Sequence, residues 1–163
     1  MARAAVTATL DALDWRLLAE LQRDAAQTNA ELAAHAFTSP ATALRRVRAL
    51  REHGIIERSV ALLSPEALGA SLSAIIDVTL DVQNAEAFVA FERLVAPEAA
   101  ITQVYQTGPA VDFTVFVVVS TMADYQSLVR RVFTAEHNVR NIRTRFVSRR
   151  CKFEPALPLP LVS

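Results

Sequence analysis

The sequence has 163 residues, of which 52% are hydrophobic and 21% are charged. This composition is typical of a globular protein with a substantial core, in one domain or two small ones, and excludes a disordered chain. The 17 basic and 17 acidic residues cancel. That balance excludes a general polyanion binder of the histone type but leaves a local basic face open.

Cysteine usage and hydropathy predict a cytoplasmic protein. Cys151 is the only cysteine, which excludes a disulfide framework and a multi-cysteine zinc site. The N-terminal run is interrupted by Asp11 and is too short and polar for a secretory signal. No apolar run approaches the roughly 18 residues of a membrane helix, so no membrane contact is expected.

Three helices are expected in the first third of the chain. Residues 11–24 carry one apolar stripe at helical spacing, formed by Leu13, Leu17, Leu18 and Leu21. Thr28 and Glu31 have the spacing of a capping box, which predicts a short second helix that ends near Ala36.

The third helix is expected to begin at Ser39 and Pro40, since serine caps backbone N–H groups and proline suits the first helical position. Its buried stripe is predicted at Leu44, Val47 and Leu50. Gly54 is the expected left-handed stop, and residues 57–63 have the composition of an extended segment. Three short helices followed by extended chain are the order of a winged helix-turn-helix.

The third helix is also strongly basic, because Glu52 alone opposes Arg45, Arg46, Arg48 and Arg51. A basic helix with a small, capped N-terminus fits the major groove of DNA and brings its N–H groups near phosphates. Double-stranded DNA is therefore the expected partner. A solvated helix face is the other interpretation of the same charges.

The second half predicts a ferredoxin-like β-α-β-β-α-β sandwich, which makes the whole chain an α+β protein. Strands are expected at residues 72–82, 101–107, 112–120 and 139–148. Asn84 and Thr121 are the expected caps of the two intervening helices, which would cover one face of the sheet. Strand 112–120 is apolar on both sides, which predicts that a second subunit covers the other face.

These segments resemble the Lrp/AsnC (leucine-responsive/asparagine regulator, feast/famine) family of transcriptional regulators over nearly the whole chain, residues 10–153. The resemblance is carried by LDALDWRLLAELQRDA, by SPATALRRVRALREHGIIERSVALLSPEALG, and by TGPAVDF in the second half. It implies a winged helix-turn-helix that binds DNA and a second domain that senses a small effector, usually an amino acid. It also implies homodimers that assemble into octamers or similar rings.

Three parts are expected on this basis. Residues 1–63 form the DNA-binding domain with a linker strand, residues 64–154 form the effector-binding and oligomerisation domain, and residues 155–163 form an irregular proline-rich tail.

The candidate DNA-binding residues lie in and beside the basic helix; they are Ser39, Ala41, Thr42, Arg45, Arg46, Arg48, Arg51 and Arg58. Thr42 and Arg45 are the candidates for base edges, whereas Arg48, Arg51 and Arg58 are the candidates for phosphates. Two roles are open for Arg46: contact with DNA, or attachment of the helix to its own domain.

The resemblance places the effector at the turn between the second and third strands of the sensor, at a subunit interface. The candidates are Tyr105, Thr107, Gly108, Pro109, Ala110, Asp112 and His137. Gly108 lets a ligand approach the backbone, and the carboxylate of Asp112 can bind an ammonium group. A tight turn, the start of a strand and side-chain packing are the ordinary alternatives for these positions.

Three positions depart from the family pattern. The usual glycine between the second and third helices is Phe37, which would be strained if that turn needs a positive φ. The Gly-x-x-Asp turn is one residue longer here, from Gly108 to Asp112, and an arginine usual after the first helix is Ala26.

Two other functions remain open at this point. An architectural nucleoid-type protein would bind DNA without an effector and with a steep salt dependence. A tetrapyrrole-pathway enzyme of the same architecture would need acid–base groups in the sensor pocket, whose strands offer Gln103, Tyr105, Gln106 and Asp112. No catalytic residue, cofactor or metal site is expected, since there is no nucleophile–base pair and the three histidines lack ligand spacing.

Overall fold

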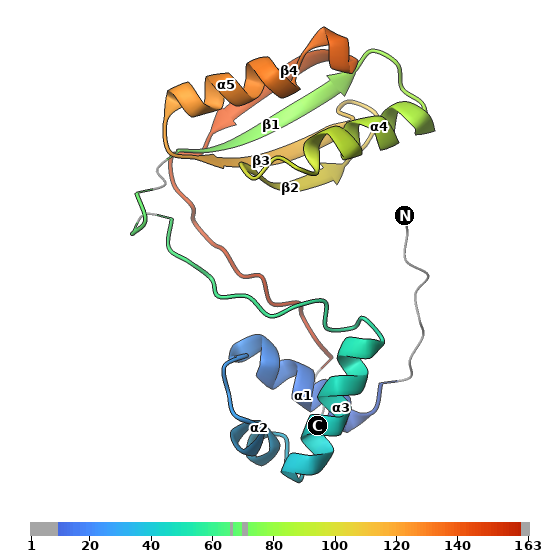
Figure 1. The fold of residues 1–163 in the computed structure, drawn as a ribbon, viewed down its shortest axis with the longest axis vertical. Coiled ribbons are helices and arrows are strands. Elements are labelled where there is room, and N and C mark those ends of the chain that lie inside the picture. The colour runs from blue at the N-terminus through green and yellow to red at the C-terminus, as the bar shows by residue number, and fades with distance from the viewer. Residues whose placement is uncertain (1–9, 66, 70–71, 161–163) are drawn as a thin grey trace. The chain divides into compact units, whose positions relative to one another are not determined.

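The computed structural model describes residues 10–65, 67–69 and 72–160. The chain divides into two compact units (Figure 1). The helical unit contains residues 10–62 and 152–160, and the sheet unit contains the described part of 63–151. The C-terminal segment, expected to be a separate irregular tail, thus groups with the helical unit. No helix in the described ranges is long and apolar enough to cross a membrane.

The helical unit consists of α1 (Ala12–Arg23), α2 (Asn29–His35) and α3 (Pro40–Glu52). Each helix begins at a side chain that accepts a backbone N–H from its first turn, namely Asp11, Thr28 and Ser39. These caps satisfy donors that a helix start otherwise leaves unpaired. The three helices enclose a small core of Leu17, Leu32, Ala33, Ala36, Ala43 and Val47.

The capping box of α2 makes the stability of the helical unit depend on pH. The backbone N–H and the hydroxyl of Thr28 donate to the Glu31 carboxylate, each at 2.8 Å, and these bonds lower the pKa of Glu31. Because the pKa is depressed in the folded state, the stabilisation is complete above the ordinary glutamate pKa of about 4.3 and is lost as pH falls through the folded value.

We therefore expect Glu31→Gln to flatten the loss of stability between about pH 5 and 3. Urea unfolding followed by the fluorescence of Trp15 measures this effect, because Trp15 is the only tryptophan and lies in α1. An unchanged pH slope would contradict the assignment to Glu31.

Two features of the helical unit differ from the sequence prediction. The prediction that Leu44 is buried was wrong: its side chain is 52% exposed, and the buried stripe of α3 is Ala43, Val47 and Leu50. Residues 57–63, predicted to be an extended segment, form neither helix nor strand in the structure of one chain. Strand formation in a wing needs a neighbouring strand to pair with.

The sheet unit contains four strands, two long helices and a short 3-10 helix. In chain order the elements are β1 (Leu72–Leu80), α4 (Ala85–Val95), β2 (Ile101–Gln106), β3 (Phe113–Val119), α5 (Met122–Val132), η1 (Ala135–His137) and β4 (Val139–Phe146). The strand order is β2-β3-β1-β4, and every neighbouring pair is antiparallel. The predicted ferredoxin-like architecture is confirmed (Figure 1).

Both helices of the sheet unit pack against one face of the sheet. Alternate residues of β1 and β3 point into this core, where they meet Phe91 and Val95 of α4 and Leu128 and Val132 of α5. The opposite face carries Ile75, Phe116 and Val118, which are only half-buried in one chain. One face is therefore closed by the chain's own helices, while the other remains partly open.

Candidate DNA-binding helix and effector turn

The outward face of α3 is basic and exposed. Arg45, Arg48 and Arg51 are all exposed, and Arg58 is exposed in the segment after the helix. Arg48 donates to Glu52 at 2.9 Å, but the Arg48 side chain is 80% exposed. Such surface pairs are weak, so this one leaves the Arg48 guanidinium available to an anionic partner.

The N-terminus of α3 is capped by its own side chains. The Ser39 hydroxyl accepts the backbone N–H of Thr42 at 3.2 Å and donates to the Thr42 hydroxyl at 2.8 Å. Ala41 beside them is small and exposed. The first turn of α3 thus presents small side chains, which favour close approach to a phosphate.

Arg46 is directed into the helical unit. Its guanidinium lies 2.8 Å from the Asp11 carboxylate and 3.2 Å from the Asp14 carboxylate, and Asp14 is buried. The Asp14 backbone N–H and the charge of Arg46 together hold the pKa of Asp11 below its ordinary value. Of the two roles open for Arg46, this geometry favours the second, in which Arg46 attaches α3 to α1.

The turn between α2 and α3 has the hydrogen bonds of a Schellman motif. The N–H of Phe37 donates to the carbonyl of Ala34 at 3.2 Å, and that of Thr38 donates to the carbonyl of Ala33 at 2.9 Å. This motif needs a left-handed residue after the helix, which is usually glycine. Phe37 takes that position with φ of 56° and an 85% exposed side chain. The turn keeps its ordinary shape and holds phenylalanine in a strained conformation.

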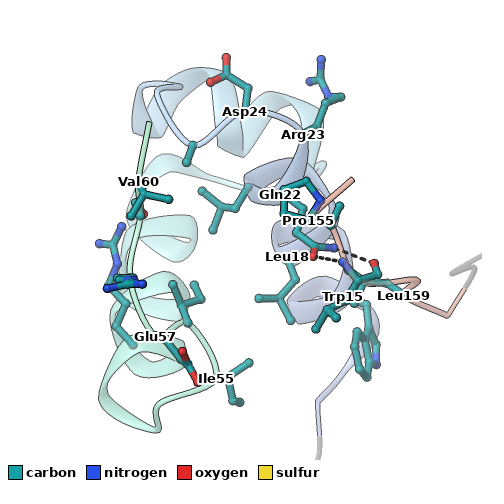
Figure 2. Close-up of a pocket in the computed structure, with 18 of the residues that line it drawn as sticks. Trp15, Leu18, Gln22, Arg23, Asp24, Ile55, Glu57, Val60, Pro155 and Leu159 are labelled. Atoms are coloured by element: carbon teal, nitrogen blue, oxygen red, sulfur yellow. Dashed lines mark hydrogen bonds between the residues drawn. The ribbon is translucent and has the colours of Figure 1, made fainter. Parts of the chain in front are cut away.

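A cavity of about 720 Å³ lies in the helical unit between α1, the segment after α3 and the C-terminal segment. Its apolar lining includes Trp15, Leu18, Ile55 and Val60 (Figure 2). The Gln22 side chain binds the backbone of Leu157 twice, accepting its N–H at 2.6 Å and donating to its carbonyl at 3.0 Å. Gln22 therefore fastens the C-terminal segment beside α1.

Gln22→Ala removes both of these hydrogen bonds. We expect the free energy of unfolding of the helical unit to fall by about 1 kcal/mol, since net contributions of exposed hydrogen bonds are small. Urea unfolding followed by Trp15 fluorescence measures the loss, and Gln126→Ala, an exposed position in α5, is the matched control. Equal urea midpoints for the two variants would show that the two hydrogen bonds between Gln22 and Leu157 contribute nothing to stability.

The predicted effector turn between β2 and β3 is held by its own hydrogen bonds. The backbone N–H of Thr107 donates to the Asp112 carbonyl at 2.9 Å, and the Thr107 hydroxyl donates to the Val111 carbonyl at 2.7 Å. A side chain added at Gly108 would meet nothing within 4 Å, so the turn is open around this residue. Pro109 and Ala110 are exposed at its tip.

Asp112 is already engaged within the sheet unit. Its Oδ2 accepts the backbone N–H of Leu80 at 2.7 Å and the side-chain amide of Gln83 at 3.1 Å. This carboxylate fixes the end of β1 against the start of β3. An ammonium group that bound Asp112 would have to use its other oxygen or displace Gln83.

The remaining effector candidates lie in different surroundings. The Tyr105 side chain is half exposed on β2 and packs edge-on against Phe116, with ring centroids 6.0 Å apart. The Nδ1 atom of His137 lies 3.1 Å from the Val132 carbonyl oxygen, and His137 lines a hollow of about 660 Å³ beside α4. That hollow contains no residue of the turn 107–112.

Family models match both units. The AsnC-type helix-turn-helix domain matches residues 10–51, and the Lrp/AsnC ligand binding domain matches residues 73–157. The chain belongs to the Lrp/AsnC family. It is a transcriptional regulator of this type, with a DNA-binding helix-turn-helix followed by a ligand-binding domain.

Similar proteins span most of this Lrp/AsnC chain. An HTH-type transcriptional regulator of Haemophilus influenzae is 36% identical over 139 residues, covering 85% of this chain and 83% of the relative. The leucine-responsive regulatory protein of Rhizobium meliloti is 36% identical over 147 residues, covering 90% and 94%. A transcriptional regulator from Neisseria meningitidis, solved in complex with L-Met, superposes with a TM-score of 0.83 at 28% identity, covering 92% and 97%.

Three features of this Lrp/AsnC chain were not found from its sequence. Leu44 is exposed on the basic helix, Gln83 binds the carboxylate of the effector turn, and Gln22 binds the C-terminal segment. A stripe of Ala43, Val47 and Leu50 at i, i+4 and i+7 was the available signal for the first. The two glutamine contacts join residues far apart in the chain, and no local spacing indicates them.

Proposed function

We propose that this Lrp/AsnC protein binds specific double-stranded DNA through the outward face of α3. Arg45 reads base edges, with Thr42 and Ala41 at the groove entrance. Arg48, Arg51 and Arg58 contact phosphates, and the capped helix start at Ser39 approaches another. Arg46 supports the helix from behind. The observation that carries the proposal is the exposed arginine face on a helix whose opposite side packs into a small core.

We also propose a homodimer that assembles further, up to an octamer or a similar ring. The half-buried outer face of the sheet, with Ile75, Phe116 and Val118, supports this part. Apolar residues of a sheet face are stabilised when a second layer excludes water from them. Two-fold symmetry would place two copies of α3 on half-sites about one DNA turn, or a multiple of it, apart.

We further propose that a small effector, an amino acid, acts through the ligand-binding domain. The open turn at Thr107, Gly108, Pro109 and Ala110 offers backbone groups, and Tyr105, Asp112 and His137 are the candidate side chains. The L-Met complex of the Neisseria meningitidis regulator supports an amino acid as the ligand class. The relatives are named as regulators, which supports a role without catalysis.

The test begins with selection of a binding site from a randomised pool of duplexes. Fluorescence anisotropy then compares the selected and scrambled duplexes at two salt concentrations, with and without each of the twenty amino acids. Preference for the selected duplex, altered by one amino acid, supports specific DNA binding and its control by an effector. Equal and steeply salt-dependent binding to both duplexes would favour an architectural protein instead. Preference without any amino-acid effect would remove the effector part.

A further inference from the structure

Two large apolar side chains are exposed at the basic helix α3: Leu44 lies on the helix, and Phe37 lies in the turn before it. Leu44 lies at i, i+4 and i+7 with Arg48 and Arg51, so the three side chains share one line along α3. The Leu44 side chain is 52% exposed, whereas the neighbouring Ala43 is completely buried. A leucine in this place stabilises no core.

Phe37 precedes the N-terminus of the same helix and is unusual in both backbone conformation and exposure. It combines a left-handed backbone with φ of 56° and a side chain that is 85% exposed. Phenylalanine in this conformation costs free energy relative to glycine, and exposure means that no burial offsets the cost. Strained residues of this kind gather at functional sites.

The charges around these side chains identify the class of partner. Arg45 is next to Leu44 in sequence, and Arg48 and Arg51 continue its line, all exposed. A second copy of this face would be repelled by the same charges, whereas a polyanion would be attracted. The apolar group that a DNA major groove presents to such a helix is the C5 methyl of thymine.

We propose that Leu44 and Phe37 form the apolar part of the DNA-reading face and contact thymine methyl groups. This inference rests on the proposed function and extends it from charge to sequence preference. Leu44 takes the methyl contact from α3 within the groove. Phe37 takes a second one at the entrance of the helix, where N-terminal residues of a recognition helix meet base edges.

The test replaces thymines of the selected duplex one at a time by deoxyuridine, which lacks only the methyl group. We expect wild-type affinity to fall about three- to five-fold at one or more positions, because burying one methyl group changes a binding constant by about this factor. The Leu44→Ala variant should bind the thymine duplex more weakly than wild type. At one of these positions, deoxyuridine should no longer lower its affinity further. Leu68→Ala, another exposed leucine, is the matched control and should respond as wild type does.

The Phe37→Gly variant distinguishes a DNA contact of Phe37 from a role in the stability of the turn. Glycine adopts the left-handed turn without strain, so the midpoint of thermal unfolding should rise while DNA affinity falls. At a second thymine position, replacement by deoxyuridine should no longer change the DNA affinity of this variant.

Affinity that is unchanged by deoxyuridine at every position of a tightly bound duplex would overturn this inference and leave the proposed function intact. Failure of the wild-type protein to prefer any duplex would overturn the proposed function itself.

Discussion

Arg46→Ala is expected to lower the free energy of unfolding of the helical unit by about 2–3 kcal/mol, because it leaves a buried carboxylate without its cation. Asp14 is the buried partner, and Arg46 lies 3.2 Å from it and 2.8 Å from Asp11. The Arg46 side chain is itself one-third exposed, so water relieves part of the cost. Urea unfolding followed by Trp15 fluorescence measures the change.

The DNA affinity of the folded Arg46→Ala protein distinguishes the two roles of this arginine. We expect it to stay within about two-fold of wild type at a temperature where the variant is fully folded, since Arg46 already faces the acids of α1. Arg130→Ala, an exposed arginine of α5, is the control for loss of charge alone. Normal stability combined with weak DNA binding would make Arg46 a DNA contact instead.

Phe113→Ala should have a still larger effect, about 3–5 kcal/mol, on the sheet unit. Phe113 is completely buried at the start of β3, where its ring lies 4.6 Å from that of Phe91 and 5.8 Å from that of Phe88. Alanine removes the aromatic contacts and leaves a cavity that the neighbouring helix and strands cannot fill.

Hydrogen exchange of the β1 and β3 amides, followed by mass spectrometry on the full chain, measures this loss within the sheet unit. Val89→Ala, at an exposed position of α4, serves as the control and should change the exchange little. The Trp15 unfolding transition reports the helical unit in the same samples. Slow exchange that persists in the Phe113 variant would contradict the packing of the core.

Local features of the fold could be predicted from the sequence because their causes are local. A cap and the N–H groups that it satisfies lie within three residues, so Asp11, Thr28, Ser39, Asn84 and Thr121 all mark the starts of helices. The polar–apolar alternation of β1 likewise identifies the side that packs on the helices, whereas the sequence of β3 is apolar on both sides and gives no such signal. The family resemblance then joined these elements into two known domains.

The burial of Leu44 was predicted wrongly for a geometric reason. An α-helix has about 3.6 residues per turn, so repeated steps of three residues drift around its axis. The series Leu44, Val47, Leu50 therefore leaves the buried side at one end, whereas Ala43, Val47, Leu50 stays on it. The small side chain of Ala43 made the better stripe easy to overlook.

Long-range contacts of the site could not be predicted in the same way. The hydrogen bonds between Gln22 and Leu157 join residues that are 135 positions apart in the chain. Asp112 likewise binds Leu80 and Gln83 in a distant segment of the sheet unit. The choice between the two roles of Arg46 likewise depended on where Asp11 and Asp14 lie in space. Only tertiary packing places these groups within hydrogen-bonding distance.

The role of the outward face of α3 in DNA recognition is tested most directly by one titration series. Fluorescence anisotropy on the selected duplex compares the wild-type protein with Arg45→Ala, with Arg130→Ala as the control. We predict that Arg45→Ala weakens specific binding by about 1–3 kcal/mol and reduces the preference over scrambled DNA, while the control binds as wild type does. Equal affinities for all three proteins would contradict DNA reading by this face.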